Sequence, residues 1–125
     1  MKATELMVGD LVCLEDDTNY ELPLKVDGVI EDDISLEEDG FLGGIDGLIR
    51  PIPITPEILE KNGWKETEYW HEYEDGNTII QYSLSNIWGI INGIEIEHFK
   101  CEYVHQLQHL LRLCGLDELA DNFKV

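Results

Sequence analysis

Two histidines, His105 and His109, have the residue type and the spacing to do chemistry. They stand four residues apart within Tyr103–Gly115, which reads YVHQLQHLLRLCG, and with Gln108 and Arg112 they form the expected polar face of this stretch. In a helix this spacing places both imidazoles on one face, where they can bind Zn²⁺ or another transition metal. No Glu follows His105 to make an H-E-x-x-H motif, and no cysteine pair supplies further ligands. We therefore expect both histidines at a solvent face or its rim, and neither a metal nor another cofactor. His105 and His109 are kept as the metal candidates.

The same histidines also have the chemistry of a general acid–base pair. Glu102 lies one turn before His105, and His98 lies a few residues upstream. The sequence shows no nucleophile and no oxyanion-stabilising motif to act with them. A non-enzymatic function is therefore expected. A metal-dependent enzyme that uses the His105/His109 face stays as an alternative.

Acidic residues form the second group with chemical potential. The chain has 125 residues, and 27 acidic residues against 8 lysines and arginines give a formal net charge of −19. Such a surface repels phosphate backbones and anionic membranes, so we expect neither nucleic acid nor a membrane as a direct partner. No acidic run fits the D-x-[DN]-x-[DN]-G calcium loop. The expected interaction surface is built from two neighbouring runs: Glu31, Asp32, Asp33, Glu37, Glu38 and Asp39.

The three cysteines, Cys13, Cys101 and Cys114, each lie in or beside an apolar segment. An odd number without a close pair is typical of buried thiols in a reducing compartment. The first residues lack the apolar core of a signal peptide, and no apolar run has the roughly 18–20 residues that a membrane span needs. A cytoplasmic location is therefore expected.

Short strands are expected before residue 54. Apolar runs lie at Leu11–Leu14, Leu22–Glu31 and Ile34–Leu36, and Gly28 indicates a bulge or bend in the second run. A glycine-rich stretch follows, out of which a twisted strand is expected to reach Ile54. Several short strands at this spacing predict a strand-rich, SH3-like N-terminal lobe over residues 1–54.

Residues 55–125 are expected to form a second lobe, unless both lobes share one compact domain. Thr55 as N-cap and Pro56 at the first helical position predict a short helix over Pro56–Lys61. Period-two alternation and glycine turns predict a four-stranded antiparallel meander over Lys65–Phe99. Its first strand is expected over Lys65–Tyr73. The turns are expected at Asp75-Gly76-Asn77, Ser85-Asn86 and Asn92-Gly93, and the last strand is expected to put Ile94, Ile96 and His98 on one face.

The helix expected over Tyr103–Cys114 has the clearest one-sided apolar pattern. Its apolar residues recur at helical spacing, and Gly115 follows them as a C′ residue. We expect this helix to pack across the apolar face of the meander, which makes the fold class α+β. The residues expected on its buried face are Val104, Leu107, Leu111 and Cys114.

Three stretches of the chain form a recognisable pattern. Leu6–Val12 reads LMVGDLV, Pro51–Trp64 reads PIPITPEILEKNGW, and Tyr103–Gly115 completes the set. In order and spacing they resemble a family of small uncharacterised proteins encoded in prophages and mobile elements of gut Bacteroidota. The resemblance covers roughly a quarter of the chain directly, and Glu31–Asp39 lies outside it. It implies a phage or mobile-element origin, and it carries over no activity and no catalytic residues.

The expected function is that of a small, acidic accessory protein of phage or mobile-element origin. It is expected to act by binding another protein, one that is basic in charge. The alternative is an acidic inhibitor that imitates the phosphates of DNA and occupies the nucleic-acid groove of a host protein. The oligomeric state is left open by the sequence.

Overall fold

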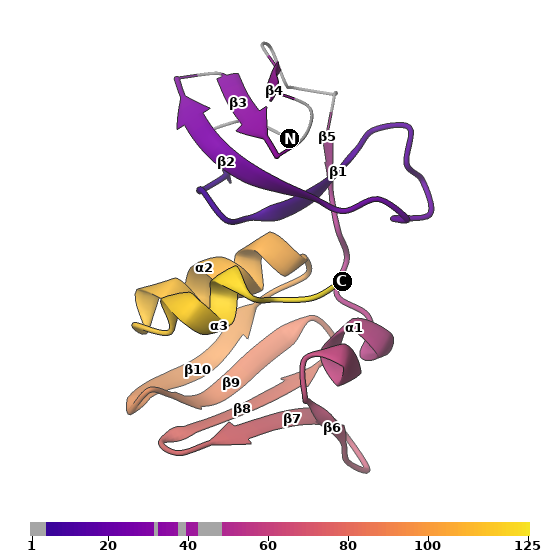
Figure 1. Ribbon diagram of the computed structural model, residues 1–125. Helices are drawn as coiled ribbons and strands as arrows, with labels where there is room; N and C mark the ends of the chain where they lie inside the picture. The colour runs from indigo at the N-terminus through magenta and orange to yellow at the C-terminus, as the bar shows by residue number, and fades with distance from the viewer. Residues whose placement is uncertain (1–4, 32, 38–39, 43–48) are drawn as a thin grey trace. The chain divides into compact units, whose positions relative to one another are not determined.

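The computed structural model describes residues 5–31, 33–37, 40–42 and 49–125. Its fold is α+β, with two antiparallel sheets and three helices, and the fold class is as predicted. The chain divides into an N-terminal unit, Met1–Ile52, and a C-terminal unit, Pro53–Val125 (Figure 1). No helix in the described part of the chain is long and apolar enough to cross a membrane.

In the described part of the N-terminal unit, five short strands form one sheet in the order β4-β3-β2-β1-β5. The predicted bend at Gly28 is confirmed, because the register between β2 and β3 shifts between Val26 and Gly28. Part of the strand predicted to reach Ile54 falls on residues 43–48, which lie outside the described residues. The strands are β1 (Leu11–Leu14), β2 (Leu24–Ile30), β3 (Asp33–Leu36), β4 (Gly40–Leu42) and β5 (Ile49–Pro51). Their buried core consists of Leu6, Val12, Val26, Ile34, Leu36 and Ile49.

The C-terminal unit begins with helix α1 (Pro56–Lys61), at the residues predicted. Thr55 is the N-cap, and its Oγ1 accepts a hydrogen bond from the backbone N–H of Ile58 at 3.3 Å. Ile58 and Leu59 are buried and anchor the helix. Five antiparallel strands follow, in the order β10-β9-β8-β7-β6. They are β6 (Lys65–Glu66), β7 (His71–Asp75), β8 (Thr78–Ser83), β9 (Asn86–Ile91) and β10 (Ile94–Lys100).

The prediction of a four-stranded meander is wrong by one strand. Lys65–Tyr73 is not one strand, because the chain reverses between β6 and β7. Thr67 closes this reversal: its backbone N–H and its hydroxyl both donate to the carbonyl of Trp70, each at 2.7 Å. The Thr67 hydroxyl also accepts from the backbone N–H of Trp70 at 3.1 Å. Threonine hydroxyls compete with regular backbone pairing in this way, and the period-two pattern of the sequence conceals it.

The later turns of the meander follow the predicted chemistry. Gly76-Asn77 joins β7 to β8, and Asn92-Gly93 joins β9 to β10, as predicted. The turn between β8 and β9 uses Leu84-Ser85, one residue before the predicted position. Leu84 and Ser85 adopt φ of 49° and 63°, which is the left-handed conformation of a tight hairpin turn.

Helices α2 (Val104–Leu113) and α3 (Asp117–Asp121) lie over one face of this second sheet (Figure 1). Gln106 caps α2, because its Oε1 accepts from the backbone N–H groups of Glu102 and Tyr103 at 2.8 and 3.1 Å. Gly115 ends the helix with a φ of 83°, as predicted for a C′ residue. The predicted apolar face is confirmed, since Val104, Leu107, Leu111 and Cys114 are all buried.

Removing the buried leucines of α2 should destabilise the C-terminal unit. Leu107 is 0% exposed and Leu111 is 2% exposed, so Leu107→Ala or Leu111→Ala should lower the free energy of unfolding by roughly 2–5 kcal/mol. Urea titration followed by tryptophan fluorescence measures this, because all three tryptophans lie in the C-terminal unit. Leu113, 80% exposed on the same helix, is the matched control, and Leu113→Ala should leave the midpoint nearly unchanged. Equal midpoints for Leu107→Ala and wild type would refute the packing of α2.

Candidate functional site

The face of the second sheet that turns away from α2 and α3, called the open face below, carries an apolar centre between carboxylates. Directly paired residues of antiparallel strands share a face, so the register defines which side chains meet there. Ile79 and Ile90 are paired across β8 and β9, and they are 36% and 44% exposed. Glu74 pairs with Ile79 on one side, and Glu95 pairs with Ile90 on the other. This row therefore runs acid, apolar, apolar, acid across four strands.

A second row on the open face is aromatic. It consists of Trp70, Trp88 and His98, with Tyr69 beside Trp70, and is called the aromatic row below. The ring centroids lie 6.2 Å apart for Trp70 and Trp88, 5.6 Å for Trp88 and His98, and 6.4 Å for Tyr69 and Trp70. Such spacings are typical of aromatic pairs in edge or tilted contact. Tyr69 is 72% exposed, so the row ends in solvent.

Hydrogen bonds to Glu72 hold one end of the aromatic row. The carboxylate of Glu72 accepts from Trp70 Nε1 at 3.4 Å and from Gln81 Nε2 at 3.0 Å. Gln81 in turn pairs in register with Trp88. The indole of Trp70 is thus oriented by a charged acceptor, while its ring remains beside Trp88.

A β-bulge brings His98 to the aromatic row. The register of β10 against β9 shifts between Ile96 and Phe99, so Glu97 and His98 together oppose Trp88. His98 has a φ of 22°, and its ring lies over the open face beside Trp88. The prediction that His98 shares a face with Ile94 and Ile96 is therefore wrong. Alternation fails here because one extra residue in a strand exchanges the faces of all residues after it.

Negative charge surrounds this surface. The register and the bulge place Glu72, Glu74, Glu95 and Glu97 on the open face, against Lys65 and Lys100. The ammonium group of Lys100 is 2.9 Å from Glu102, which leaves less positive charge to offset the carboxylates. An open hollow on this side is lined by Trp88, Ile90, Glu95, Glu97 and His98. The open face thus offers aromatic and aliphatic contact area within an acidic border.

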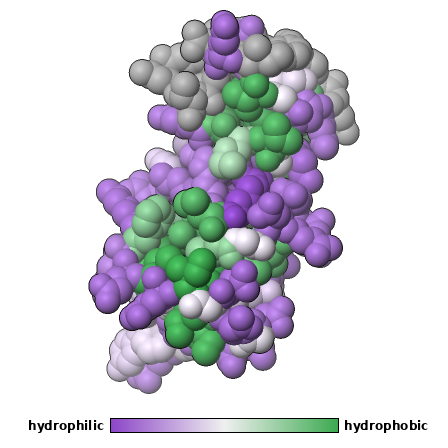
Figure 2. All heavy atoms as spheres, turned by 90° about the vertical axis from the view of Figure 1, so that its left-hand side faces the viewer, coloured by the Kyte–Doolittle hydropathy of each residue, from purple (hydrophilic) through white to green (hydrophobic). Residues whose placement is uncertain are grey.

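Hydrophobic residues also gather on the side of the C-terminal unit seen in Figure 2, within a hydrophilic border. After the bulge Phe99 pairs with Ile87, and Ile94 pairs with Ile91, so both side chains point toward the helices. Ile94 and Phe99 are each 46% exposed. The partly exposed apolar side chains of β10 therefore lie on the helix side of the strand, whereas its open-face positions are charged or polar.

The sequence-predicted metal candidates, His105 and His109, lie on α2. The structure places their rings 5.6 Å apart, and His105 stacks on Tyr103 with centroids 6.0 Å apart. The expectation of a polar, solvent-facing side for this helix is wrong for two residues, since His105 is 6% exposed and Gln108 is 0% exposed. Gln108 is buried because α3 covers it, and its Nε2 donates to the carbonyl of Ala120 at 3.0 Å. In the described part of the chain, no Cys, Asp or Glu joins the two histidines in a group of three ligands.

The predicted acidic surface is only partly described. Asp32, Glu38 and Asp39 lie outside the described residues. Glu31 and Glu37 are exposed and stand just before and just after β3, while Asp33 is half-buried within that strand. The described carboxylates of these two runs therefore lie at the two ends of one short strand.

An earlier acidic run, Glu15-Asp16-Asp17, has structural contacts. Asp17 accepts from the backbone N–H groups of Glu21 and Leu22 at 2.9 and 2.8 Å, and these bonds lower the pKa of its carboxyl. Glu15 forms an ion pair with Arg50 at 3.1 Å. Two members of this run thus shape the loop after β1.

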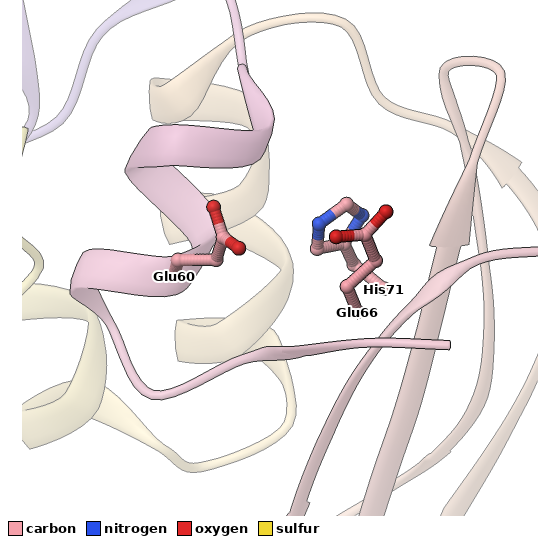
Figure 3. A group of neighbouring side chains, drawn as sticks. All are labelled: Glu60, Glu66 and His71. Atoms are coloured by element: carbon pink, nitrogen blue, oxygen red, sulfur yellow. The ribbon is translucent and has the colours of Figure 1, made fainter. Parts of the chain in front are cut away.

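A small group that the sequence reasoning missed lies on the helix side of the second sheet (Figure 3). Glu60 comes from the last turn of α1, Glu66 from β6 and His71 from β7, and their ligand atoms lie within 4.8 Å of one another. Glu66 and His71 are direct register partners. The spacing of Glu66 and His71 in the sequence matches no metal-binding motif. The two residues come together only because the chain turns at Thr67. These are the residues of the described chain that could hold a metal ion.

All three cysteines are free and buried, as the sequence predicts. Burial raises the pKa of the Cys101 thiol to about 12. Burial also raises the pKa of Cys13 to about 12, with a further contribution from its hydrogen bond to Asp17. The pKa of Cys114 is raised by burial as well. Neutral buried thiols are poor nucleophiles, so these residues belong to the core.

The chain was compared with protein-family models, with curated proteins and with solved structures, and none of them matches it.

Native cysteines should resist alkylation. At pH 8 a thiol with a pKa near 12 has a thiolate population roughly 1,000-fold smaller than one with the ordinary value of 9.0. Iodoacetamide treatment followed by mass spectrometry should therefore leave Cys13 and Cys101 unmodified in the folded protein. All three cysteines should react in urea, which is the internal control. Rapid labelling of Cys101 without denaturant would contradict its burial.

The same pKa values predict an alkaline loss of stability. The folded state keeps the Cys101 proton up to a pH of about 12, whereas the unfolded chain releases it near 9.0. This contribution to the free energy of unfolding is therefore fully present below pH 9 and is lost as the pH rises toward 12. Urea midpoints of wild type and Cys101→Ala should fall with different slopes over this interval, the wild type more steeply. If the urea midpoints of the two proteins fell with equal slopes, the pKa of Cys101 would be the same in the folded and the unfolded state, which would contradict the prediction.

Proposed function

We propose that this protein binds a basic, extended segment of a partner protein on the open face of its C-terminal unit. The observation that carries the proposal is one sheet face on which exposed isoleucines and a row of half-buried tryptophans lie beside carboxylates. The complementary ligand has an apolar or aromatic centre flanked by lysine or arginine side chains. A non-enzymatic role as an accessory protein follows from this mode of action.

The composition of the open face supports a protein ligand. Tryptophan, tyrosine and isoleucine provide contact area at a low cost in side-chain entropy, and aromatic residues are enriched at the centres of protein interfaces. The tryptophans can also accept a cation over the ring, worth roughly 0.5–2 kcal/mol depending on how far the pair is desolvated. The acidic border repels phosphate groups, so it disfavours nucleic acid as the ligand of this face.

Binding on the face is favoured over addition of a strand to the edge. β10 is the outer strand of the sheet, so its free edge would be the place for strand addition. The bulge at Glu97 and His98 interrupts the regular spacing of backbone donors and acceptors along that edge. Bulges of this kind protect edge strands from pairing. The same bulge adds His98 to the aromatic row, which strengthens the face as the binding surface.

Two further proposals concern the origin and the N-terminal unit. The strand order β4-β3-β2-β1-β5, with the last strand returning to pair with the first, supports an SH3-like classification of that unit. The resemblance of the PIPITPEILEKNGW and YVHQLQHLLRLCG stretches supports a phage or mobile-element origin. Such an origin would make a host protein in the cytoplasm the partner.

Peptide titrations test the proposed function. Short synthetic peptides that alternate arginine with leucine should change the tryptophan fluorescence in a saturable way, and acidic peptides of equal length should not. Trp88→Ala should weaken the binding roughly ten-fold or more, because it removes the centre of the aromatic row. Glu95→Gln should weaken it less and should reduce its dependence on salt.

Matched variants separate binding from folding. Leu84, 91% exposed in the β8–β9 turn, is the control, and Leu84→Ala should bind the peptide as wild type does. If Trp88→Ala lowers the urea midpoint, its weaker binding could result from unfolding. His98→Ala is then the deciding variant, because His98 is an exposed member of the aromatic row. Unaltered affinity in both Trp88→Ala and His98→Ala would exclude the open face as the binding surface.

A further inference from the structure

We propose that Glu60, Glu66 and His71 bind a divalent transition-metal ion, with Zn²⁺ as the best match to the donor set. This proposal is independent of peptide binding, because the three residues lie on the helix side of the sheet. Figure 3 shows the three side chains converging from α1, β6 and β7 on one space. Their ligand atoms lie within 4.8 Å of one another.

The scaffold around this group holds all three of its elements in place. The turn at Thr67 fixes β6 against β7, and the register sets Glu66 opposite His71. Asn62, at the end of α1, donates through Nδ2 to the carbonyl of Ile58 at 2.7 Å and to that of Lys124 at 2.8 Å. The backbone N–H of Lys124 donates back to Asn62 Oδ1 at 2.8 Å. Glu60 therefore projects from a helix end that is tied to the C-terminal residues.

The histidine gives the second, independent indication of a ligand. His71 Nε2 is shielded from solvent, and no group in the described part of the chain forms a hydrogen bond with it. Buried polar atoms in proteins nearly always have a partner, and where no protein group serves, a bound ion or an ordered water commonly does. Among the described residues, neither Glu60 nor Glu66 forms an ion pair with lysine or arginine. Two carboxylates so close together repel each other, and a divalent cation removes that repulsion.

The donor set fits zinc chemistry. Zn²⁺ accepts imidazole nitrogen and carboxylate oxygen at about 2.0–2.2 Å, so neighbouring ligand atoms in a tetrahedral site lie roughly 3.3 Å apart. The ligand atoms must therefore approach one another by up to about 1.5 Å, which the exposed side chains of Glu60 and Glu66 provide by rotation. Three protein ligands leave the fourth position for water. One imidazole with two carboxylates also suits Mn²⁺ and Fe²⁺, so these ions belong in the comparison.

Isothermal titration with Zn²⁺ in the presence of excess Mg²⁺ tests the site. Mg²⁺ occupies exposed carboxylates of a chain with a net charge of −19, so only a selective site takes up Zn²⁺. The expected result is one equivalent bound by the full chain. Glu60→Gln, Glu66→Gln and His71→Gln should each reduce the Zn²⁺ affinity roughly ten-fold or more. Glu57→Gln on the same helix and His98→Gln on the opposite face are the matched controls and should bind as wild type does.

Two outcomes would overturn the proposal. Loss of Zn²⁺ binding in His109→Gln together with its retention in His71→Gln would place the ion on α2. Absence of Zn²⁺ uptake above the Mg²⁺ background would show that the acidic group attracts cations only weakly. If His71→Gln lowers the urea midpoint in metal-free buffer, a loss of Zn²⁺ binding in that variant could result from unfolding. Glu60→Gln is then the deciding variant, because Glu60 is exposed and its replacement leaves the core intact.

Discussion

Burial of one face of the second sheet by α2 is the interaction on which the C-terminal unit depends. Ile80, Ile87 and Ile91 are completely buried on that face, and Leu107 and Leu111 pack into the same core. The hairpin between β9 and β10 is also held there, because Asn92 Nδ2 donates to the carbonyl of Cys114 at 2.8 Å. A sheet has two faces, and α2 and α3 lie over only one of them. The opposite face remains as surface, and its half-buried tryptophans and exposed isoleucines contribute nothing to this core.

Much of this fold follows from local chemistry that a single sequence reveals. Thr55 and Pro56 predict the start of α1, and Gly115 predicts the end of α2. The glycine-containing turns predict the positions of two of the hairpins. These signals are strong because each depends on a backbone conformation that few residue types favour. The polar side of α2 is predicted wrongly for a different reason. Gln108 is buried by α3, a contact between separate helices that residue spacing within α2 does not reveal.

The candidate sites are less accessible to sequence reasoning. His98 joins the aromatic row only because of a bulge, and a bulge leaves no reliable mark in the alternation of residues. Glu66 and His71 meet because Thr67 reverses the chain between them. In an uninterrupted strand these two residues, five positions apart, would be separated by roughly 16 Å. The helical spacing of His105 and His109 is visible at once, yet spacing alone says nothing about a third ligand. Short-range patterns identify elements, and contacts between elements make sites.

The alternation of side chains along β8, β9 and β10 has a consequence for how this protein can change. Neighbouring positions of one strand belong to different surfaces: Ile80 and Ile87 are buried, while Ile79 and Trp88 belong to the open face. A substitution at an open-face position therefore changes the chemistry of that surface while leaving the packing against α2 almost untouched. Surface chemistry and stability are set by adjacent but separable residues. The open face can consequently change one residue at a time while the fold is kept.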